Sequence, residues 1–150
     1  NQVSVDIVAE DDASTLYRKV LDVIPDQLRN ITEALTNGTL DARPQNHSHA
    51  TYWRKRGPTD GLIDWRMSAR SIHNLVRGLA RPYVGAEFLF RETVVKLWKS
   101  EIVITRSPTN SEPGKVLAVG PDGPVIQAGE DAIRLIECDQ EIILLERDYL

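Results

Sequence analysis

One amphipathic helix with a sharp stop most constrains what this chain can fold into. Ser68 is a residue type that caps helix N-termini, and the apolar residues after it recur at intervals of three and four. That spacing puts one apolar stripe on a helix, which must pack against a core. Pro82 cannot continue a helix, so the pattern predicts a helix over residues 68–80. The stripe consists of Ile72, Leu75, Val76 and Leu79.

The residues on either side of this helix predict a junction between two packed bodies. Upstream, residues 58–61 read Pro-Thr-Asp-Gly, which is typical of a turn, and Ile63 and Trp65 then supply an apolar anchor. Downstream of Pro82 the apolar spacing changes to the alternation of strands. The helix therefore joins a helical front to a β-rich tail, and we predict an α+β fold.

The front end predicts one strand and one long helix. Apolar residues at positions 3–7 alternate with polar ones, as in a half-buried or edge strand. Acidic residues at 10–12 then stand where a helix dipole favours them, and helical spacing continues to Gly38. Pro25 removes a backbone donor inside this pattern, so we expect it to kink the helix or split it in two.

The tail predicts short antiparallel strands with no helix between them. A strand around Phe88 precedes a longer run over 94–104, with a turn at 92–93. Residues 107–114 have the composition of a loop, and Gly-Pro-Asp-Gly at 120–123 is a turn. Such strands close most economically into a small barrel, of which the OB type is the nearest standard form. Further strands are predicted over 115–119, 124–128, 132–138 and 141–146.

Charge is distributed unevenly along the chain, whose net charge is −4. Residues 42–106 carry twelve cations and five acids, a net charge of +7, between acidic ends of −5 and −6. A basic middle of this kind indicates a contact with phosphate or another anion. The alternative is that arginine stems cover apolar surface and pair with the acidic flanks.

Composition and cysteine content predict a soluble protein of a reducing compartment, the cytoplasm. No apolar run approaches the roughly 18 residues of a membrane span, and no signal-peptide pattern opens the sequence. The single cysteine, Cys138, excludes an internal disulfide. Its place in an apolar run predicts a buried, inert thiol.

The sequence contains no recognisable catalytic motif. The adjacent carboxylates of Asp11 and Asp12 stand at the start of a helix, where acidic residues are well solvated, so they need no catalytic explanation. His47 and His49 have no further ligands nearby, so we predict no metal site. His73 lies off the apolar stripe, and we expect an interface histidine rather than a general base.

Four motifs in a fixed order resemble the junction of the 10-formyltetrahydrofolate-dependent formyltransferases. In that family such motifs link a catalytic domain to a C-terminal barrel, and four of them within about forty residues are a specific signal. The likeness extends, more weakly, over nearly the whole chain. The motifs are Thr51-Tyr52, Arg54-Lys55-Arg56, Ile63-Asp64-Trp65, and a run from Arg77 through Pro82 to Gly85-Ala86.

The resemblance implies that this chain is the back end of a two-part enzyme. Residues 1–41 match the end of the catalytic domain, a strand and a helix, with Asp11-Asp12 at the matching positions. Residues 42–67 would be a linker, and residues 68–150 the linker helix and an OB-like barrel. The chain starts without Met, so we expect a catalytic N-terminal half before it, which would be this chain's partner.

The same resemblance places the chemistry outside this chain. The family uses an Asn, a His-x-Ser-x-x-Pro segment and a downstream Asp to promote attack of an amine on the formyl group. This sequence has no such His segment, and Asp6 does not match the Asp. We therefore expect no catalytic residue here, no formyl transfer by this chain alone, and 10-formyltetrahydrofolate bound by the missing part.

The basic segment is the predicted substrate-binding part. In the family it lies near the mouth of the active site, which implies that Tyr52, Arg54, Lys55 and Arg56 contact a phosphate-bearing amine acceptor. The His73-Asn74 pair and the Pro-Thr-Asp-Gly-Leu-Ile-Asp-Trp run over residues 58–65 resemble the amino-sugar type, whose acceptor is a nucleotide-linked amino sugar.

Two alternatives stay open. A tRNA-contacting domain of a methionyl-tRNA formyltransferase would use the basic middle to neutralise phosphates. A non-enzymatic OB-type binding module would stack bases on Phe88, Phe90 and Trp98, although alternation makes these equally good core residues. A purely architectural domain that covers the catalytic half is compatible with the first reading.

Overall fold

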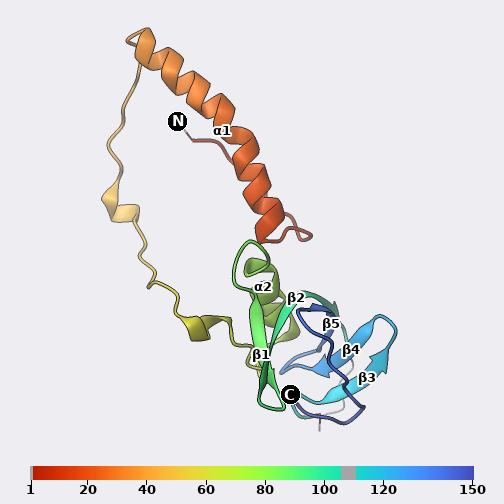
Figure 1. Ribbon diagram of the computed structural model, residues 1–150. Helices are drawn as coiled ribbons and strands as arrows, with labels where there is room; N and C mark the ends of the chain where they lie inside the picture. The colour runs from red at the N-terminus through yellow and green to blue at the C-terminus, as the bar shows by residue number, and fades with distance from the viewer. Residues whose placement is uncertain (1, 106–110) are drawn as a thin grey trace.

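The computed structural model describes residues 2–105 and 111–150, with helices first and strands after (Figure 1). The predicted α+β class is confirmed, as a small domain with a five-stranded antiparallel sheet and two α-helices. The elements are α1 Ala13–Thr36, η1 His47–His49, η2 Pro58–Gly61, α2 Ala69–Gly78, β1 Ala86–Phe90, β2 Thr93–Val103, β3 Val116–Gly120, β4 Gly123–Gln127 and β5 Ala132–Cys138.

The strands form one sheet in the order β1-β2-β5-β4-β3. Two hairpins, β1 with β2 and β3 with β4, are joined by β5, which lies between β2 and β4. Strand β2 is long enough to pair with β1 through residues 93–97 and with β5 through residues 97–103. Strands β1 and β3 end this hydrogen-bonded order, and closure into an OB-like barrel stays a prediction.

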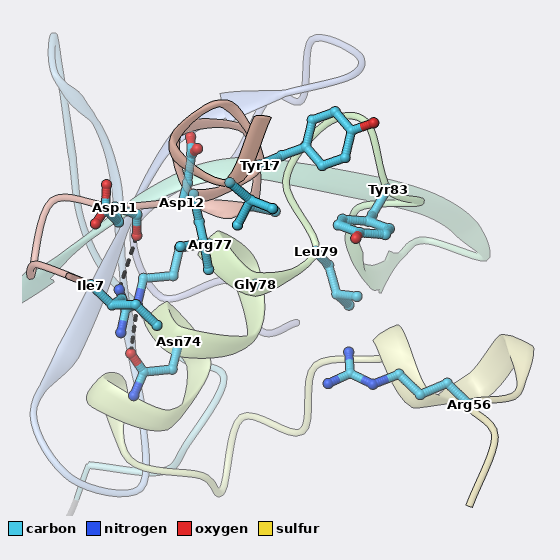
Figure 2. A pocket seen from close by; sticks show the side chains of 13 residues that line it. Ile7, Asp11, Asp12, Tyr17, Arg56, Asn74, Arg77, Gly78, Leu79 and Tyr83 are labelled. Atoms are coloured by element: carbon cyan, nitrogen blue, oxygen red, sulfur yellow. Dashed lines mark hydrogen bonds between the residues drawn. The ribbon is translucent and has the colours of Figure 1, made fainter. Parts of the chain in front are cut away.

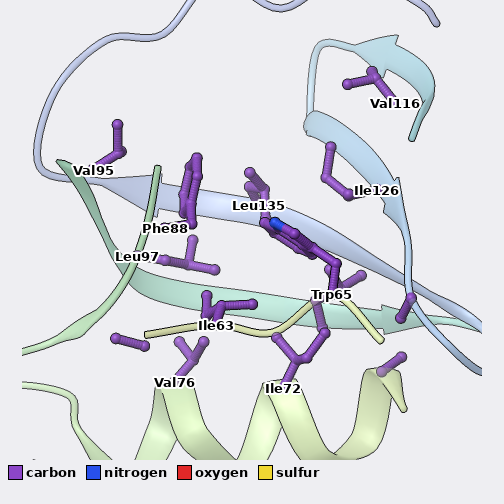
Figure 3. Packing of buried hydrophobic residues seen from close by; sticks show 14 of the residues in the cluster. Ile63, Trp65, Ile72, Val76, Phe88, Val95, Leu97, Val116, Ile126 and Leu135 are labelled. Carbon is purple, nitrogen blue, oxygen red and sulfur yellow. The ribbon is translucent and has the colours of Figure 1, made fainter. Parts of the chain in front are cut away.

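Helix α2 packs its apolar stripe against one face of the sheet (Figure 3). The Ser68 hydroxyl accepts a hydrogen bond from the Ser71 N–H at 3.2 Å, so the predicted cap is confirmed. The predicted apolar anchor belongs to the same core, where Trp65 meets Phe88 edge-on with ring centroids 5.6 Å apart. Other fully buried members are Ile72, Val76, Val95, Leu97, Val116, Ile126 and Ile133.

Helix α1 extends away from the sheet (Figure 1) and buries none of its residues. Asp12 caps it by accepting from the Thr15 N–H at 2.8 Å, while the Thr15 hydroxyl accepts from the Asp12 N–H. Of the two outcomes expected at Pro25, the split is wrong, because α1 runs through that residue as one helix, and the kink stays a prediction. One missing donor in 24 residues leaves the ladder on either side intact.

Two predicted strands are not formed. Residues 3–7 have no regular structure, because the described part of the chain offers them no neighbouring strand. Residues 141–146 keep the alternation, with Ile142 and Leu144 in the core cluster and Ile143 exposed. They have no regular structure, and the nearest pairing is an isolated antiparallel bridge between Lys115 and Tyr149.

The hairpin turns lie close to their predicted places. Arg91 and Glu92 turn between β1 and β2, one residue earlier than predicted, with φ of 48° and 66°. Positive φ at both positions matches the twist of a two-residue hairpin. The second turn falls inside the predicted Gly-Pro-Asp-Gly at 120–123. Of the loop predicted over 107–114, residues 107–110 lie outside the described residues.

Between α1 and the sheet, residues 37–57 are exposed except for Ala50. The division into residues 1–41, 42–67 and 68–150 stays a prediction, but Ile63 and Trp65 already belong to the core. In the part of the chain that the structure describes, no helix is both long enough and apolar enough to cross a membrane.

Candidate functional site

The predicted basic segment lies on the surface just before η2. The side chains of Tyr52 and Trp53 are 90% and 92% exposed. Arg54 instead makes a bidentate ion pair with Asp60, which also accepts the Gly57 N–H at 2.6 Å. The hydrogen bonds from Arg54 and then Gly57 hold the pKa of Asp60 well below its usual range. The ion pair of Arg54 with Asp60 therefore stabilises the turn of η2, and it occupies the guanidinium that a ligand would need.

Lys55 and Arg56 are the uncommitted cations of this segment. Both are exposed, and neither side chain has an ion-pair or hydrogen-bond partner among the described residues. Arg56 lines a cavity of about 630 Å³, whereas Tyr52, Arg54 and Lys55 do not. The structure thus brings one of the four predicted site residues to a cavity and leaves two, Tyr52 and Lys55, on open surface.

This cavity, called the junction cavity below, lies between the start of α1, helix α2 and the loop after α2 (Figure 2). Its walls are mainly apolar, with Leu16 and Val20 from α1 and Leu79 following α2. Tyr17 and Tyr83 lie near one another on one side of it. The remaining lining residues are Ile7, Asp11, Asp12, Ala13, Arg56, Asn74, Arg77 and Gly78.

Hydrogen bonds at one end of the junction cavity tie the front segment to α2. The Arg77 guanidinium donates to the Asp11 carbonyl at 2.9 Å and to Asn74 Oδ1 at 2.8 Å (Figure 2). The buried Asp11 carboxylate accepts from Lys19 Nζ at 2.6 Å and from the Val8 N–H at 2.8 Å. These bonds, led by that from Lys19, lower the pKa of Asp11 to about 2.

The surroundings of His73 and Cys138 fit a structural role for each residue rather than a catalytic one. His73 Nδ1 lies 3.1 Å from the Ser100 hydroxyl, and burial, followed by the charge of Arg77, lowers the pKa of the imidazole. Burial, followed by Asp139 and Glu137, raises the pKa of the half-buried Cys138 thiol to about 11, which disfavours the nucleophilic thiolate. Among the described residues, no three His, Cys, Asp or Glu side chains are grouped to hold a metal ion.

Sequence reasoning missed the residues that build the junction cavity. Tyr17 was placed on a helix and Tyr83 after another, but nothing local indicated that they share a cavity. Arg77 was named only as the start of the family motif that runs to Gly85-Ala86, and not as a partner of the front segment. A weak signal existed in Asp11-Asp12, since a carboxylate next to a cap residue often has a second partner, here Lys19.

The family described as "Formyl transferase, C-terminal domain" matches residues 56–142, more than half of the chain. The matched range runs from Arg56 to Ile142 and includes α2 and the whole sheet. It therefore covers the core except Leu144, while α1 and most of the segment that follows it lie outside the match.

Solved structures of HypX from Aquifex aeolicus share the fold. The form in complex with tetrahydrofolic acid has a TM-score of 0.59 and 17% identity over 89% of this chain and 23% of HypX. A variant with four substitutions has a TM-score of 0.60 and 16% identity over 89% and 24%. This chain thus spans about a quarter of the length of the HypX chains that it matches.

Proposed function

Because the chain belongs to the family of formyl transferase C-terminal domains, we propose that it is the back part of an N-formyltransferase. The whole protein would transfer a formyl group from 10-formyltetrahydrofolate to an amine of a nucleotide-linked amino sugar. The observation that carries this proposal is the family match over residues 56–142, which begins at Arg56, the last residue of the basic segment. The amino-sugar acceptor rests on the sequence likeness around His73 and Asn74.

The partner in this proposal is a catalytic N-terminal part of the same protein. Helix α1 keeps its apolar stripe exposed, although burying such a stripe is what stabilises most amphipathic helices. Packing of α1 on a larger α/β domain would cover the part of the stripe that lies beyond the junction cavity, as would be expected for the last helix of that domain. The exposed apolar residues of that part are Leu21, Ile24, Leu28 and Leu35, while Tyr17 and Val20 line the junction cavity.

Formyl transfer needs groups that we do not expect this chain to supply. A base must take the proton of the attacking amine, and donors must stabilise the tetrahedral oxyanion. His73 is half-buried against Ser100, and the carboxylates of Asp11 and Asp60 are held ionised by cations. We therefore assign folate binding and catalysis to the N-terminal part, and expect no turnover by residues 1–150 alone.

The role left to this chain is to hold the acceptor. Lys55 and Arg56 are exposed cations without partners among the described residues, and so can pair with phosphate oxygens. Arg54 would position them by fixing the turn through Asp60. The exposed ring of Tyr52 stands two residues before this ion pair.

Charge reversal at Lys55 in the full-length enzyme tests this role. We expect Lys55→Glu to raise KM for the nucleotide sugar about tenfold with little change in kcat, because the lost contact forms equally in the ground and transition states. Arg70→Glu is the matched control, since Arg70 is an exposed cation on α2 outside the junction cavity. An unchanged KM in Lys55→Glu would remove the assignment.

The second candidate is the tRNA-contacting domain of a methionyl-tRNA formyltransferase. It is favoured by the net charge of +7 over residues 42–106 and by the exposed rings of Tyr52 and Trp53 beside three cations. Titration of the chain with initiator tRNA at several salt concentrations separates the two candidates. Salt-dependent tRNA binding, without binding of a nucleotide sugar, would support the tRNA role or a free-standing OB-type module.

A further inference from the structure

Four polar groups of the junction cavity are free to meet a ligand, one of them the amide nitrogen of Asn74. The Asp11 carboxylate is occupied by Lys19, the Asp12 carboxylate by the cap of α1, and the Arg77 guanidinium by Asn74 and the Asp11 carbonyl. The hydroxyls of Tyr17 and Tyr83 and the guanidinium of Arg56, in contrast, have no partner within the described ranges. The free set is therefore two phenols, one amide nitrogen and one cation.

The two tyrosines are held in place by the backbone. Tyr17 lies in the second turn of α1, whose start is fixed by the Asp12 cap. The Tyr83 N–H donates to the Ala80 carbonyl at 3.1 Å, and the Gly85 N–H donates to the Leu79 carbonyl at 2.9 Å, which fastens the loop to the end of α2. Both rings are about half exposed and border the same cavity, as Figure 2 shows.

This arrangement fits a planar ring that carries an anion. Aromatic faces beside apolar walls bind planar rings by stacking and by burial of their surface. A free guanidinium pairs with a phosphate group through charge-assisted hydrogen bonds. A volume of about 630 Å³ is in the range of small-molecule sites.

We propose that the junction cavity binds the nucleoside phosphate portion of the acceptor, with the base against Tyr17 and Tyr83 and a phosphate oxygen on Arg56. The proposal rests on the proposed function, and it gives that function a base-binding site formed by α1, the loop after α2 and the basic segment. It also assigns roles to Tyr17 and Tyr83, because they select ligands that carry a ring over ligands that carry phosphate alone.

Binding of uridine monophosphate to the 150-residue chain tests the proposal by calorimetry. We expect saturable binding that Tyr83→Ala and Tyr17→Ala each weaken about tenfold, because one stacked base is lost. Tyr17→Phe, which keeps the ring, should bind nearly as well as the unmodified chain. Arg56→Gln should weaken binding of uridine monophosphate and leave that of uridine unchanged.

Matched controls separate the cavity from general effects of substitution. Tyr149→Ala removes a half-exposed ring, and Arg70→Gln an exposed cation, both outside the junction cavity. Neither should change the affinity for uridine monophosphate. Near-UV circular dichroism confirms that each variant keeps the packing of Trp65.

Three results would overturn the proposal: no saturable binding, equally tight binding of inorganic phosphate, or equal losses in the control variants. Assays of the full-length enzyme distinguish failure of the cavity assignment from failure of the proposed function. If it formylates a nucleotide sugar with the same KM in wild type and Tyr83→Ala, the proposed function stands and the cavity assignment fails. If the chain binds uridine monophosphate as expected but the enzyme transfers no formyl group, the cavity assignment stands and the proposed function fails.

Discussion

Glycine 85 shows why a single residue type is needed at the end of the junction stretch. Gly85 has φ of 82°, and a Cβ there would lie 3.0 Å from the Trp98 ring. The guanidinium of Arg81 also lies over that ring, 4.3 Å from its centroid. A residue with a side chain at position 85 would have a strained backbone conformation and would displace Trp98. Backbone conformation and packing therefore explain the glycine of the Gly-Ala pair.

Replacing Gly123 should destabilise the sheet strongly. Gly123 has φ of 109°, and an added Cβ would lie 2.0 Å from the Leu135 carbonyl oxygen, which belongs to the neighbouring strand. We expect Gly123→Ala to lower the free energy of unfolding by about 3 kcal/mol, measured by urea denaturation. Gly120→Ala is the control, because a Cβ at that position meets no atom within 4 Å. Equal midpoints for the two variants would contradict this account.

At the scale of elements, the two helices have similar patterns but different surroundings. Both carry an apolar stripe at helical spacing, yet α2 buries Ala69, Ile72 and Val76 while α1 buries nothing. The stripe of α2 faces β2 and β5 across the core (Figure 3). Periodicity therefore predicts that a helix has a face to bury, and its position in the fold decides whether the face is covered.

The cap of α2 should contribute measurably to stability. Ser68→Ala removes the oxygen that accepts the Ser71 N–H, and we expect a loss of about 1 kcal/mol in the free energy of unfolding. Ser71→Ala is the control, since it removes the hydroxyl contact with Ser68 but keeps the N–H donor. A larger loss in Ser71→Ala than in Ser68→Ala, measured by urea denaturation, would contradict the capping role.

At the scale of the whole molecule, the core belongs to the second part of the chain. Every member of the buried cluster lies between Ile63 and Leu144. The front segment meets this body at the junction cavity, where Arg77 binds the Asp11 carbonyl. The stability of the sheet and the position of α1 are therefore largely separate properties.

A chain shortened to residues 57–150 should still unfold cooperatively. We expect its Tm to lie within about 3 °C of that of residues 1–150 by calorimetry, because no core residue is removed. A chain that begins at residue 67 is the control, since it loses Ile63 and Trp65 and should be destabilised by several kcal/mol. Loss of the transition in the 57–150 chain would show that α1 is required for the fold.

Local patterns were sufficient for much of this fold. Strand β5 was predicted with its observed ends, and α2 was predicted from its cap with an end two residues late. In both cases the information lies within a few neighbouring residues, as alternation, helical spacing or a capping hydroxyl. The strand predicted over residues 141–146 failed because alternation reports burial, as at Leu144, and not hydrogen bonding to another strand.

The sequence by itself determined the α+β class, the helix that joins front to tail, and the family of the C-terminal domain, because each depends on residues close together in the chain. Only the tertiary structure decided that β5 joins the two hairpins, that Asp60 occupies Arg54, and that Tyr17 and Tyr83 share a cavity with Arg56. These are contacts between distant or differently folded segments. Their energies depend on geometry after folding, which no local pattern encodes.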